Sequence, residues 1–393
     1  MNPFLAYIIS FSAAILLYTF CWSTLYPSLS PGLLVFLVAT IAVHGAIAMR
    51  WKRSLENYPM VVLTEDSRPL YVTGLICLLW LADFVHAGGI PIIKILANEP
   101  YDYRAFGIPT LHVFTVTFAS FYTVYLFRLF LDTRKKSVLV FFCINLAAAV
   151  LIYSRAMFIF NLVSCAFIGL HYIGKLNARY LAISAAVLAV VLFLFGVLGN
   201  LRESHVHQVD DGNAFFLETG SASKSFRNSI VPNEYFWAYV YLTSPLANLQ
   251  KNINLADRHP PGIRRLGGMV VSEWIFDSIS KRLFKTKLLI DPGEHTIYPF
   301  NVSTVYSRSF SYQGWFGMAA TAIFILILPW VYLRIVGQTS PYLTIGLGIL
   351  CTMYLFMMYD NTISTTGLGF QIAYPVLFAW LEKKKLFMLR DVA

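Results

Sequence analysis

Long apolar runs, each bounded by charged residues, prolines or polar clusters, constrain this chain more than any other feature. The hydrocarbon core of a bilayer takes about 20 helical residues. Ten runs near that length cover residues 3–22, 32–49, 69–88, 109–130, 138–154, 156–173, 180–199, 313–334, 341–359 and 364–381. Only 13% of the residues are charged, whereas a soluble domain carries about a quarter. We therefore predict an all-α polytopic membrane bundle of about ten transmembrane helices.

Lysine and arginine in the short loops predict the orientation, because cytoplasmic loops carry an excess of both. The short turns at 23–31 and 360–363 hold neither, so we place them outside. The other loops and the C-terminal tail hold Arg50, Lys52, Arg53, Arg68, Arg134, Lys135, Lys136, Lys175, Arg179, Arg334, Lys383, Lys384, Lys385 and Arg390. Both termini are then cytoplasmic. The first run lacks a basic leader and a small-residue cleavage site, and we read it as a retained helix.

The organisation along the chain is uneven. We predict transmembrane helices one to seven in 1–199, a large external loop in 200–312, helices eight to ten in 313–381 and a cytoplasmic tail in 382–393. Loops this long without structure of their own are uncommon and are usually functional. We expect the loop to fold onto the membrane surface with interfacial helices.

Two helices are predicted inside this loop. In "PNEYFWAYVYLTSPLANLQ" the apolar run stops at Ser244 and Pro245, which is too short to span and favours a re-entrant or interfacial helix. In "GGMVVSEWIFDSISKRLFK" the apolar residues share one helical face, and Glu273, Asp277 and Lys281 follow at i,i+4 steps on the opposite face. This second pattern predicts one surface helix. The segment "VHQVDDGNAFF" is typical of a turn.

Arginine is the side chain that gathers on the external side, at Arg104, Arg155, Arg202, Arg227, Arg258, Arg264, Arg265 and Arg308. Its planar fork binds phosphate or carboxylate through two hydrogen bonds and stays charged when partly desolvated. At a membrane surface such a cluster favours an anionic head group, for example a diphosphate. The alternative is that each arginine pairs with an acid, since 200–312 holds nearly as many acidic as basic residues.

Two of these arginines stand out by position. Arg155, in "VLIYSRAMFIF", has almost no loop around it, so its guanidinium lies at the bilayer boundary or between helices. Charged groups there are costly and favour a functional role, with snorkelling to the interface as the alternative. Arg308 precedes the eighth run, close to Tyr312 and Gln313. We predict a site where this loop descends into the bundle, although helix packing with an aromatic belt would give the same pattern.

Several chemistries have no motif here. The chain lacks a Gly-x-x-x-x-Gly-Lys-[Ser/Thr] loop for nucleotide phosphates and lacks zinc motifs of standard spacing. Asp210 and Asp211 could mimic an acidic metal motif for a nucleotide sugar, but such donors are cytoplasmic and this pair is predicted outside. We therefore expect neither a metal nor another cofactor.

Four segments carry a family resemblance: "GGIPIIKILANEPYDYRAFGIPTLH" (88–112), "SRAMFIF", "YVYLTSPLANLQ" and "SRSFSYQGWFG". Together with the pattern of spans and loops, they look like the Wzy-type polymerases of O-antigen and capsule repeat units. Many members carry an acid before the Gly-x-x-Gly pair, where this chain has Tyr312 and Gln313. An arginine-x10-glycine pattern of some members is also unmatched at Arg202, because Gly212 comes one residue early.

The resemblance implies a glycosyltransferase of the bacterial inner membrane. It would transfer a glycan from undecaprenyl diphosphate to another lipid-linked repeat unit at the periplasmic face, without metal or nucleic acid. Whether a chain-length regulator protein joins it stays open. The site must stabilise negative charge and orient two lipid-linked substrates.

The residues compatible with this reaction form two groups. For catalysis we choose Arg155, Arg227 and Arg308 as diphosphate contacts and Glu273 as general base, with Glu234 and His205 as other candidates for the base. For substrate binding we choose Arg104, Arg202, Arg264, Arg265, Tyr235, Tyr312 and Gln313.

Three other functions share parts of this pattern. An O-antigen ligase would use the same donor and transfer the glycan to the lipid A core; the aromatic segment 228–250 favours the polymerase over it. A non-enzymatic flippase for the lipid-linked unit would be favoured by the polar residues Asp83, His86 and His112. An enzyme using a polyprenyl monophosphate sugar would carry acids in the first external loop, and "STLYPSLSP" has none.

Overall fold

Helices make up the architecture of the protein, seen in a computed structural model that describes residues 1–55, 61–63, 68–97, 99, 106–174, 177–207, 209–255, 262–283, 300 and 302–390. Within these ranges there is no β-strand, and the one isolated β-bridge joins Ser23 to Ala222. The predicted all-α class is confirmed.

Six of the described helices are long and apolar enough to cross a membrane. They are α2 (Pro31–Leu55), α3 (Arg68–His86), α5 (Leu111–Thr133), α7 (Arg155–Ile173), the apolar part of α8 (Ala178–His207) and α14 (Ser307–Val336). Three shorter apolar helices are α1 (Pro3–Tyr18), α6 (Lys136–Leu151) and α15 (Leu343–Phe356). The membrane class is thereby supported, while the count of ten spans stays a prediction.

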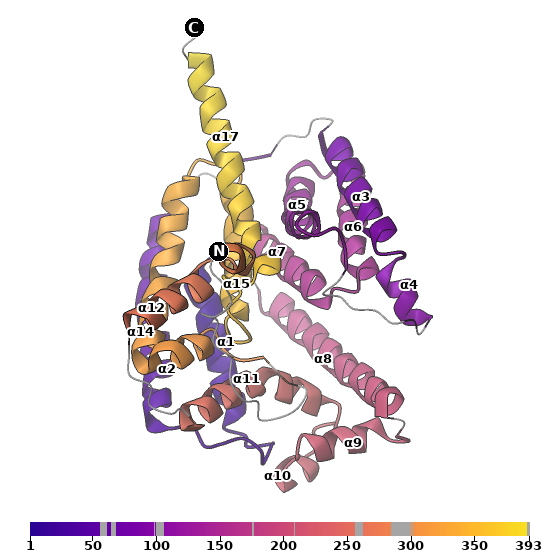
Figure 1. Cartoon of the computed structure of the whole chain (residues 1–393), viewed down its shortest axis with the longest axis vertical. Helices are drawn as coiled ribbons and strands as arrows, with labels where there is room; N and C mark the ends of the chain where they lie inside the picture. The colour runs from indigo at the N-terminus through magenta and orange to yellow at the C-terminus, as the bar shows by residue number, and fades with distance from the viewer. Residues whose placement is uncertain are drawn as a thin grey trace.

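The tenth predicted span is not one regular helix. Its residues form the short α16 (Thr366–Gly369), a 3-10 turn (Phe370–Ile372) and α17 (Ala373–Arg390). Figure 1 shows α17 leaving the bundle at one end and α9 (Gly212–Thr219) with α10 (Lys224–Arg227) at the other. We call the α17 side the basic end. Lys383 and Lys384 lie on α17, and Arg134, Lys135 and Lys136 follow α5, whose Tyr125 packs on Tyr342 beside Phe378 of α17.

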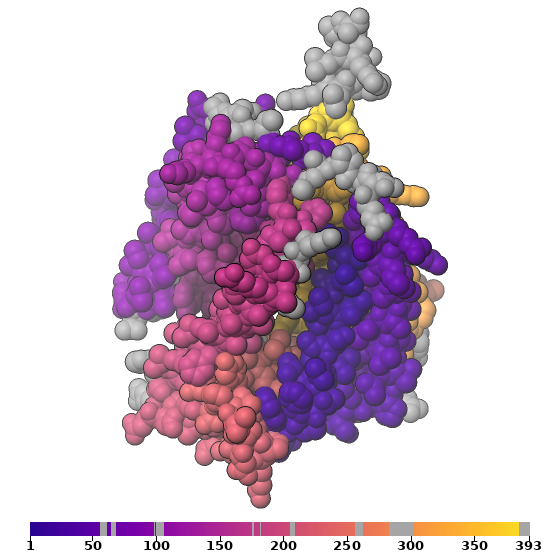
Figure 2. Space-filling view, turned by 180° about the vertical axis from the view of Figure 1, so that it is seen from behind, coloured from indigo at the N-terminus to yellow at the C-terminus, as the bar shows by residue number. Residues whose placement is uncertain are grey.

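Buried aromatic side chains hold α1 inside the bundle. Phe4 packs edge-on against Trp51 and Tyr354, with ring centroids 5.5 and 6.2 Å away. The Tyr7 and Tyr306 hydroxyls are 2.6 Å apart, which joins α1 to the loop before α14. The space-filling view shows the indigo N-terminal helices on one flank and the purple to magenta segments from α3 to α6 on the other (Figure 2).

Polar pairs link other helices. Ser164 on α7 donates to Thr352 on α15 at 2.9 Å, and the hydroxyls of Thr117 on α5 and Tyr374 on α17 are 2.8 Å apart. Interhelical hydrogen bonds of this kind replace the hydrophobic driving force that helices lack among lipids. By contrast, α8 leaves most of its apolar side chains exposed, as a helix facing hydrocarbon does.

The helix α11 (Tyr235–Leu255) corrects one prediction. The apolar run that stops at Ser244 and Pro245 predicted a short re-entrant or interfacial helix, but the helix continues through Pro245 and is 21 residues long in all. Residues 243–250 are buried, and the helix packs against α1, α8 and α14. The side chain of Asn248 donates to the Phe300 and Val302 carbonyl oxygens at 3.1 and 2.8 Å. These tertiary contacts hold the backbone helical across a proline that would end an isolated helix.

The stretch after α11 corrects a second prediction. In place of one surface helix there are α12 (Ile263–Met269), a π-helical turn (Val270–Trp274) and α13 (Asp277–Leu283). The predicted pair of Asp277 and Lys281 is confirmed, with 2.6 Å between Oδ2 and Nζ. Glu273 does not lie on an exposed face with them: it is fully buried.

Two short turns connect helices, and the second of them was predicted from the sequence. Only three residues separate α6 from α7, and Tyr153 among them has a φ of 57°. The Asp-Asp-Gly turn ends at α9, which Asp211 caps by accepting from the Asn213 and Ala214 amides at 2.9 and 3.0 Å.

Candidate active site

The buried carboxylate of Glu273 is the centre of the candidate site. It sits in the π-helical turn, a distortion that occurs frequently at functional sites. Its Oε1 accepts from the Ser272 hydroxyl at 3.1 Å, and its Oε2 accepts from the Asn361 amide at 3.1 Å. The same Asn361 nitrogen donates to the Glu273 carbonyl oxygen at 2.7 Å. Asn361 therefore fixes both the backbone and the side chain of Glu273.

The charges around Glu273 act in opposite directions on its pKa. Burial raises the pKa of this carboxyl above its ordinary value, while Arg308, Asn361 and Ser272 lower it and Asp360 raises it. Burial is the largest of these effects, because desolvation disfavours the charged form. Glu273 is thus a carboxyl with increased proton affinity, next to an arginine.

Arg308 is the cation of this pair. It is half-buried, and among the described residues its guanidinium makes neither a hydrogen bond nor an ion pair. Its charge still acts on Glu273. A guanidinium carries five N–H donors in a fixed fork, so Arg308 has donors available to an anion.

A kink in α14 brings Arg308 to this position. Gly314 has φ 58° and ψ −141°, a conformation that breaks the helix and that side chains rarely adopt. The short helical segment before it folds back so closely that a Cβ on Gly317 would lie 2.1 Å from the Ser309 carbonyl oxygen. The Gln313 side chain donates to the Gly262 carbonyl oxygen at 2.8 Å, which attaches this segment to the start of α12.

Substituting Gly317 with alanine is expected to destabilise the kink by about 1–3 kcal/mol, because the added methyl group overlaps rigid backbone. Thermal unfolding of the purified protein measures this loss. Gly74→Ala is the matched control, since a Cβ at Gly74 meets nothing within 4 Å. Equal unfolding temperatures for the two variants would show that the kink is not closely packed.

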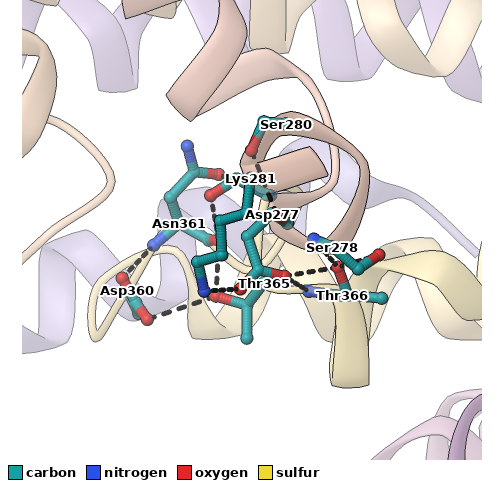
Figure 3. A network of polar contacts seen from close by, with 9 residues as sticks. Asp277, Ser278, Ser280, Lys281, Asp360, Asn361, Thr365 and Thr366 are labelled. Atoms are coloured by element: carbon teal, nitrogen blue, oxygen red, sulfur yellow. Dashed lines mark hydrogen bonds and ion pairs between the residues drawn. The ribbon is translucent and has the colours of Figure 1, made fainter. Parts of the chain in front are cut away.

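A polar network joins the site to the loop after α15 (Figure 3). Asp277 accepts from the Thr366 amide at 3.0 Å and from the Thr366 hydroxyl. Asp360 accepts from the backbone N–H of Asn361 at 2.7 Å and from the Thr365 hydroxyl at 3.3 Å. Burial tends to raise the pKa of Asp277, but Lys281 and Thr366 outweigh it, and the pKa lies below its ordinary value. Asp277 therefore carries a negative charge and holds α13 against α16.

The structure brings several predicted residues to this region. Gln313 contacts the start of α12, which carries the exposed Arg264 and the half-buried Arg265. Within the described part of the chain, Nη1 of Arg265 is buried without a hydrogen-bond partner. Tyr312 is buried beside Gln313.

Arg155 lies at the same end of the bundle. It is the first residue of α7 and is exposed, with its guanidinium 5.8 Å from the Tyr153 ring centroid. One turn further, Phe160 stacks on Phe356 at 6.0 Å, just before the loop that holds Asp360. Arg155 is therefore exposed at this end, and no contact joins it to Glu273 among the described residues.

Other predicted site residues lie in a separate region, around the Trp237 ring. Arg202 donates to Glu203 at 2.6 Å and lies 5.4 Å from the Trp237 ring centroid. Arg227 donates to the Ala222 and Leu217 carbonyl oxygens, both at 3.1 Å.

Tyr235 also serves a local contact, because its hydroxyl donates to the Ala189 carbonyl oxygen at 3.1 Å. Arg202, Arg227 and Tyr235 therefore make local structural contacts and are not part of the Glu273 region. Arg104, Arg258 and the side chain of His205 lie outside the described residues.

Two of the three polar residues singled out for a flippase, Asp83 and His112, are partners of each other, and His86 is exposed. Asp83 is buried and accepts from the Ile108 amide at 2.9 Å and from His112, whose Nδ1 is 2.8 Å away. This carboxylate ties the segment before α5 to the end of α3.

Asn361 and Asp360 were missed as site residues. They belong to the predicted turn 360–363, whose lack of lysine and arginine served only to place it outside. The available signal was its run of polar residues between two apolar stretches.

Comparison with protein-family models, with curated proteins and with solved structures finds no match for this chain.

Proposed function

We propose that this protein is an integral-membrane glycosyltransferase that polymerises undecaprenyl-diphosphate-linked oligosaccharide repeat units into O-antigen or capsular polysaccharide. The observation that carries the proposal is the pair formed by the buried Glu273 and by Arg308, whose guanidinium makes no hydrogen bond or ion pair with the described residues. The sequence resemblance to Wzy-type polymerases supplies the substrate class.

In the proposed reaction, the acceptor sugar's hydroxyl oxygen forms a bond to the anomeric carbon of the donor glycan. The bond from that carbon to the diphosphate breaks, and undecaprenyl diphosphate leaves with the electron pair. Arg308 stabilises the negative charge that grows on the leaving group. Glu273 takes the proton of the attacking hydroxyl.

The electrostatics of the pair suit this sequence of events. A diphosphate bound to Arg308 adds negative charge near Glu273 and offsets the arginine that lowers its pKa. The proton affinity of the carboxylate then increases when the donor binds. Arg264, Arg265 and Arg155 are proposed to hold more distant parts of the lipid-linked substrates, because they lie on elements around the same end.

The proposal places this site on the periplasmic side. Arg334 lies in the last turn of α14, at the basic end, whereas Arg308 lies on the segment that folds back before Gly314, where Ser309 contacts Thr321 near the start of the regular helix. By the distribution of positive charge, the basic end faces the cytoplasm of a bacterial inner-membrane protein.

Purified protein in liposomes, given undecaprenyl-diphosphate-linked repeat units without nucleotide sugar or metal, is expected to produce a ladder of glycans spaced by one repeat. Gel electrophoresis of the products measures it. Transfer to added lipid A core without a ladder would instead identify a ligase. Movement of the lipid-linked unit across the bilayer without any transfer would identify a flippase.

A further inference from the structure

A cavity lies away from Glu273, among residues of α3, α5 and α17 and beside the start of α15. It has a volume of about 150 Å³. Its lining consists of Arg68, Pro69, Val72, Phe118, Phe121, Tyr122, Tyr125, Tyr342 and Phe378. Cavities of this size with apolar walls accommodate a benzene-sized apolar group.

The aromatic side chains form a closed ring around this space. Starting from Phe118, successive ring centroids lie 5.9 Å apart to Tyr122, 5.5 Å on to Tyr125, 6.3 Å on to Tyr342, 5.5 Å on to Phe378 and 6.5 Å back to Phe118. These separations fall in the range of favourable aromatic pairs. The rings therefore support one another, and the cavity is a built feature of the bundle.

One charged side chain, Arg68, contributes to the lining. It is the first residue of α3, so the partial positive charge of that helix end adds to its own. The surroundings are basic as well: Arg134, Lys135 and Lys136 follow α5, and Lys384 on α17 lies 4.0 Å from the Trp380 ring centroid. The potential around the cavity favours an anion.

The position of the cavity restricts the kind of anion. Both α3 and α5 are candidate spans, and Arg68 and Tyr342 lie at the ends of apolar helices. Apolar side chains on the outside of the same helices are exposed, including Leu75 on α3 and Leu377 on α17. A ligand here is surrounded by hydrocarbon and needs an apolar body attached to its charge.

We propose that this cavity binds one anionic phospholipid from the leaflet at the basic end. Its phosphate lies at Arg68, and the first carbons of one acyl chain enter the ring formed by Phe118, Tyr122, Tyr125, Tyr342 and Phe378. The argument uses neither Glu273 nor Arg308, so it does not depend on the glycosyltransferase function.

Native mass spectrometry of the delipidated protein, titrated with phosphatidylglycerol or phosphatidylcholine of matched chains, tests this site. Wild type is expected to retain one phosphatidylglycerol with about tenfold preference over phosphatidylcholine, since one hydrogen-bonded ion pair in a partly desolvated site contributes on that scale. Arg68→Gln is expected to remove the preference. Lys136→Gln, which changes an exposed cation at the same end, is expected to keep it.

A second variant tests the apolar part. Val72→Phe fills the cavity without changing a charge and is expected to reduce retention of both lipids at the single tight site, while thermal unfolding reports that the protein is folded. Equal retention of the two lipids by wild type would overturn the proposal. Equal losses of the phosphatidylglycerol preference in Arg68→Gln and Lys136→Gln would also overturn it. So would unchanged lipid retention by folded Val72→Phe, because each result would mean that lipid binds loosely around the whole protein.

Discussion

Replacing Arg308 with alanine is expected to lower the turnover of glycan polymerisation by about 10²–10³-fold. Arg308 is the one proposed diphosphate contact that lies within the electrostatic reach of Glu273. Arg308→Lys keeps the charge but loses the fork, and we expect it to retain partial activity, because an ammonium group cannot bind a diphosphate through two parallel hydrogen bonds. The initial rate of ladder formation in liposomes measures both variants.

Arg179→Ala is the matched control for Arg308→Ala. Arg179 is exposed on α8, near the end of that helix far from α9. A folded Arg308→Ala protein that forms the ladder at the wild-type rate would contradict the proposed role. If Arg179→Ala lowered the rate of ladder formation by the same factor, the effect would come from the loss of any positive charge and not from the position of Arg308.

Replacing Glu273 with glutamine is expected to lower turnover by about 10²–10⁴-fold, the range that a positioned general base contributes. Glutamine keeps the shape and can still accept from Asn361. In wild type, turnover is expected to fall as the pH drops through the raised pKa of Glu273, because the protonated carboxyl cannot take a proton. The pH profile of Glu273→Gln is expected to lack this acidic limb.

The same substitution has a predictable effect on stability. The folded-state pKa of Glu273 lies above its unfolded value, so its contribution to the free energy of unfolding is fully present below the unfolded pKa. That contribution is lost as the pH rises through the folded pKa. Glu273→Gln is expected to remove this dependence and to unfold at the same or a higher temperature at neutral pH.

The exposed carboxylate of Glu218, changed to glutamine, is the control for this pair of measurements. It is expected to leave turnover and its pH profile unchanged. An acidic limb that persists in Glu273→Gln would assign the titration to another group and contradict the role of Glu273 as base.

Most of the helical architecture was predictable from the sequence, because a long apolar run is a local signal. The failures lie where distant contacts decide the local structure. Ser244 and Pro245 end the apolar run and predicted a short helix, and only the enclosure of α11 by α1, α8 and α14 explains its continuation. The break of the tenth span into α16, a 3-10 turn and α17 has the same character, since the turn at Thr366 is held by Asp277.

The candidate site was predictable in its components but not in its arrangement. The chemistry of arginine singled out Arg308, but the break of the helix at Gly314 was not predicted. Helical periodicity placed Glu273 on a solvent-facing surface with Asp277, because the π-helical turn that rotates it inward has no pattern that we recognised. The pairing with Asn361 depends on two loops meeting, which spacing along the chain does not record.

The burial of α1 has a consequence for how the chain is made in the cell. Tyr7 bonds to Tyr306 and Phe4 packs on Tyr354, so α1 finds these partners only after the chain has been translated through Tyr354. Until then α1 has mainly α2 beside it. Assembly of the bundle is therefore completed late, when the C-terminal helices pack against the hairpin formed by α1 and α2.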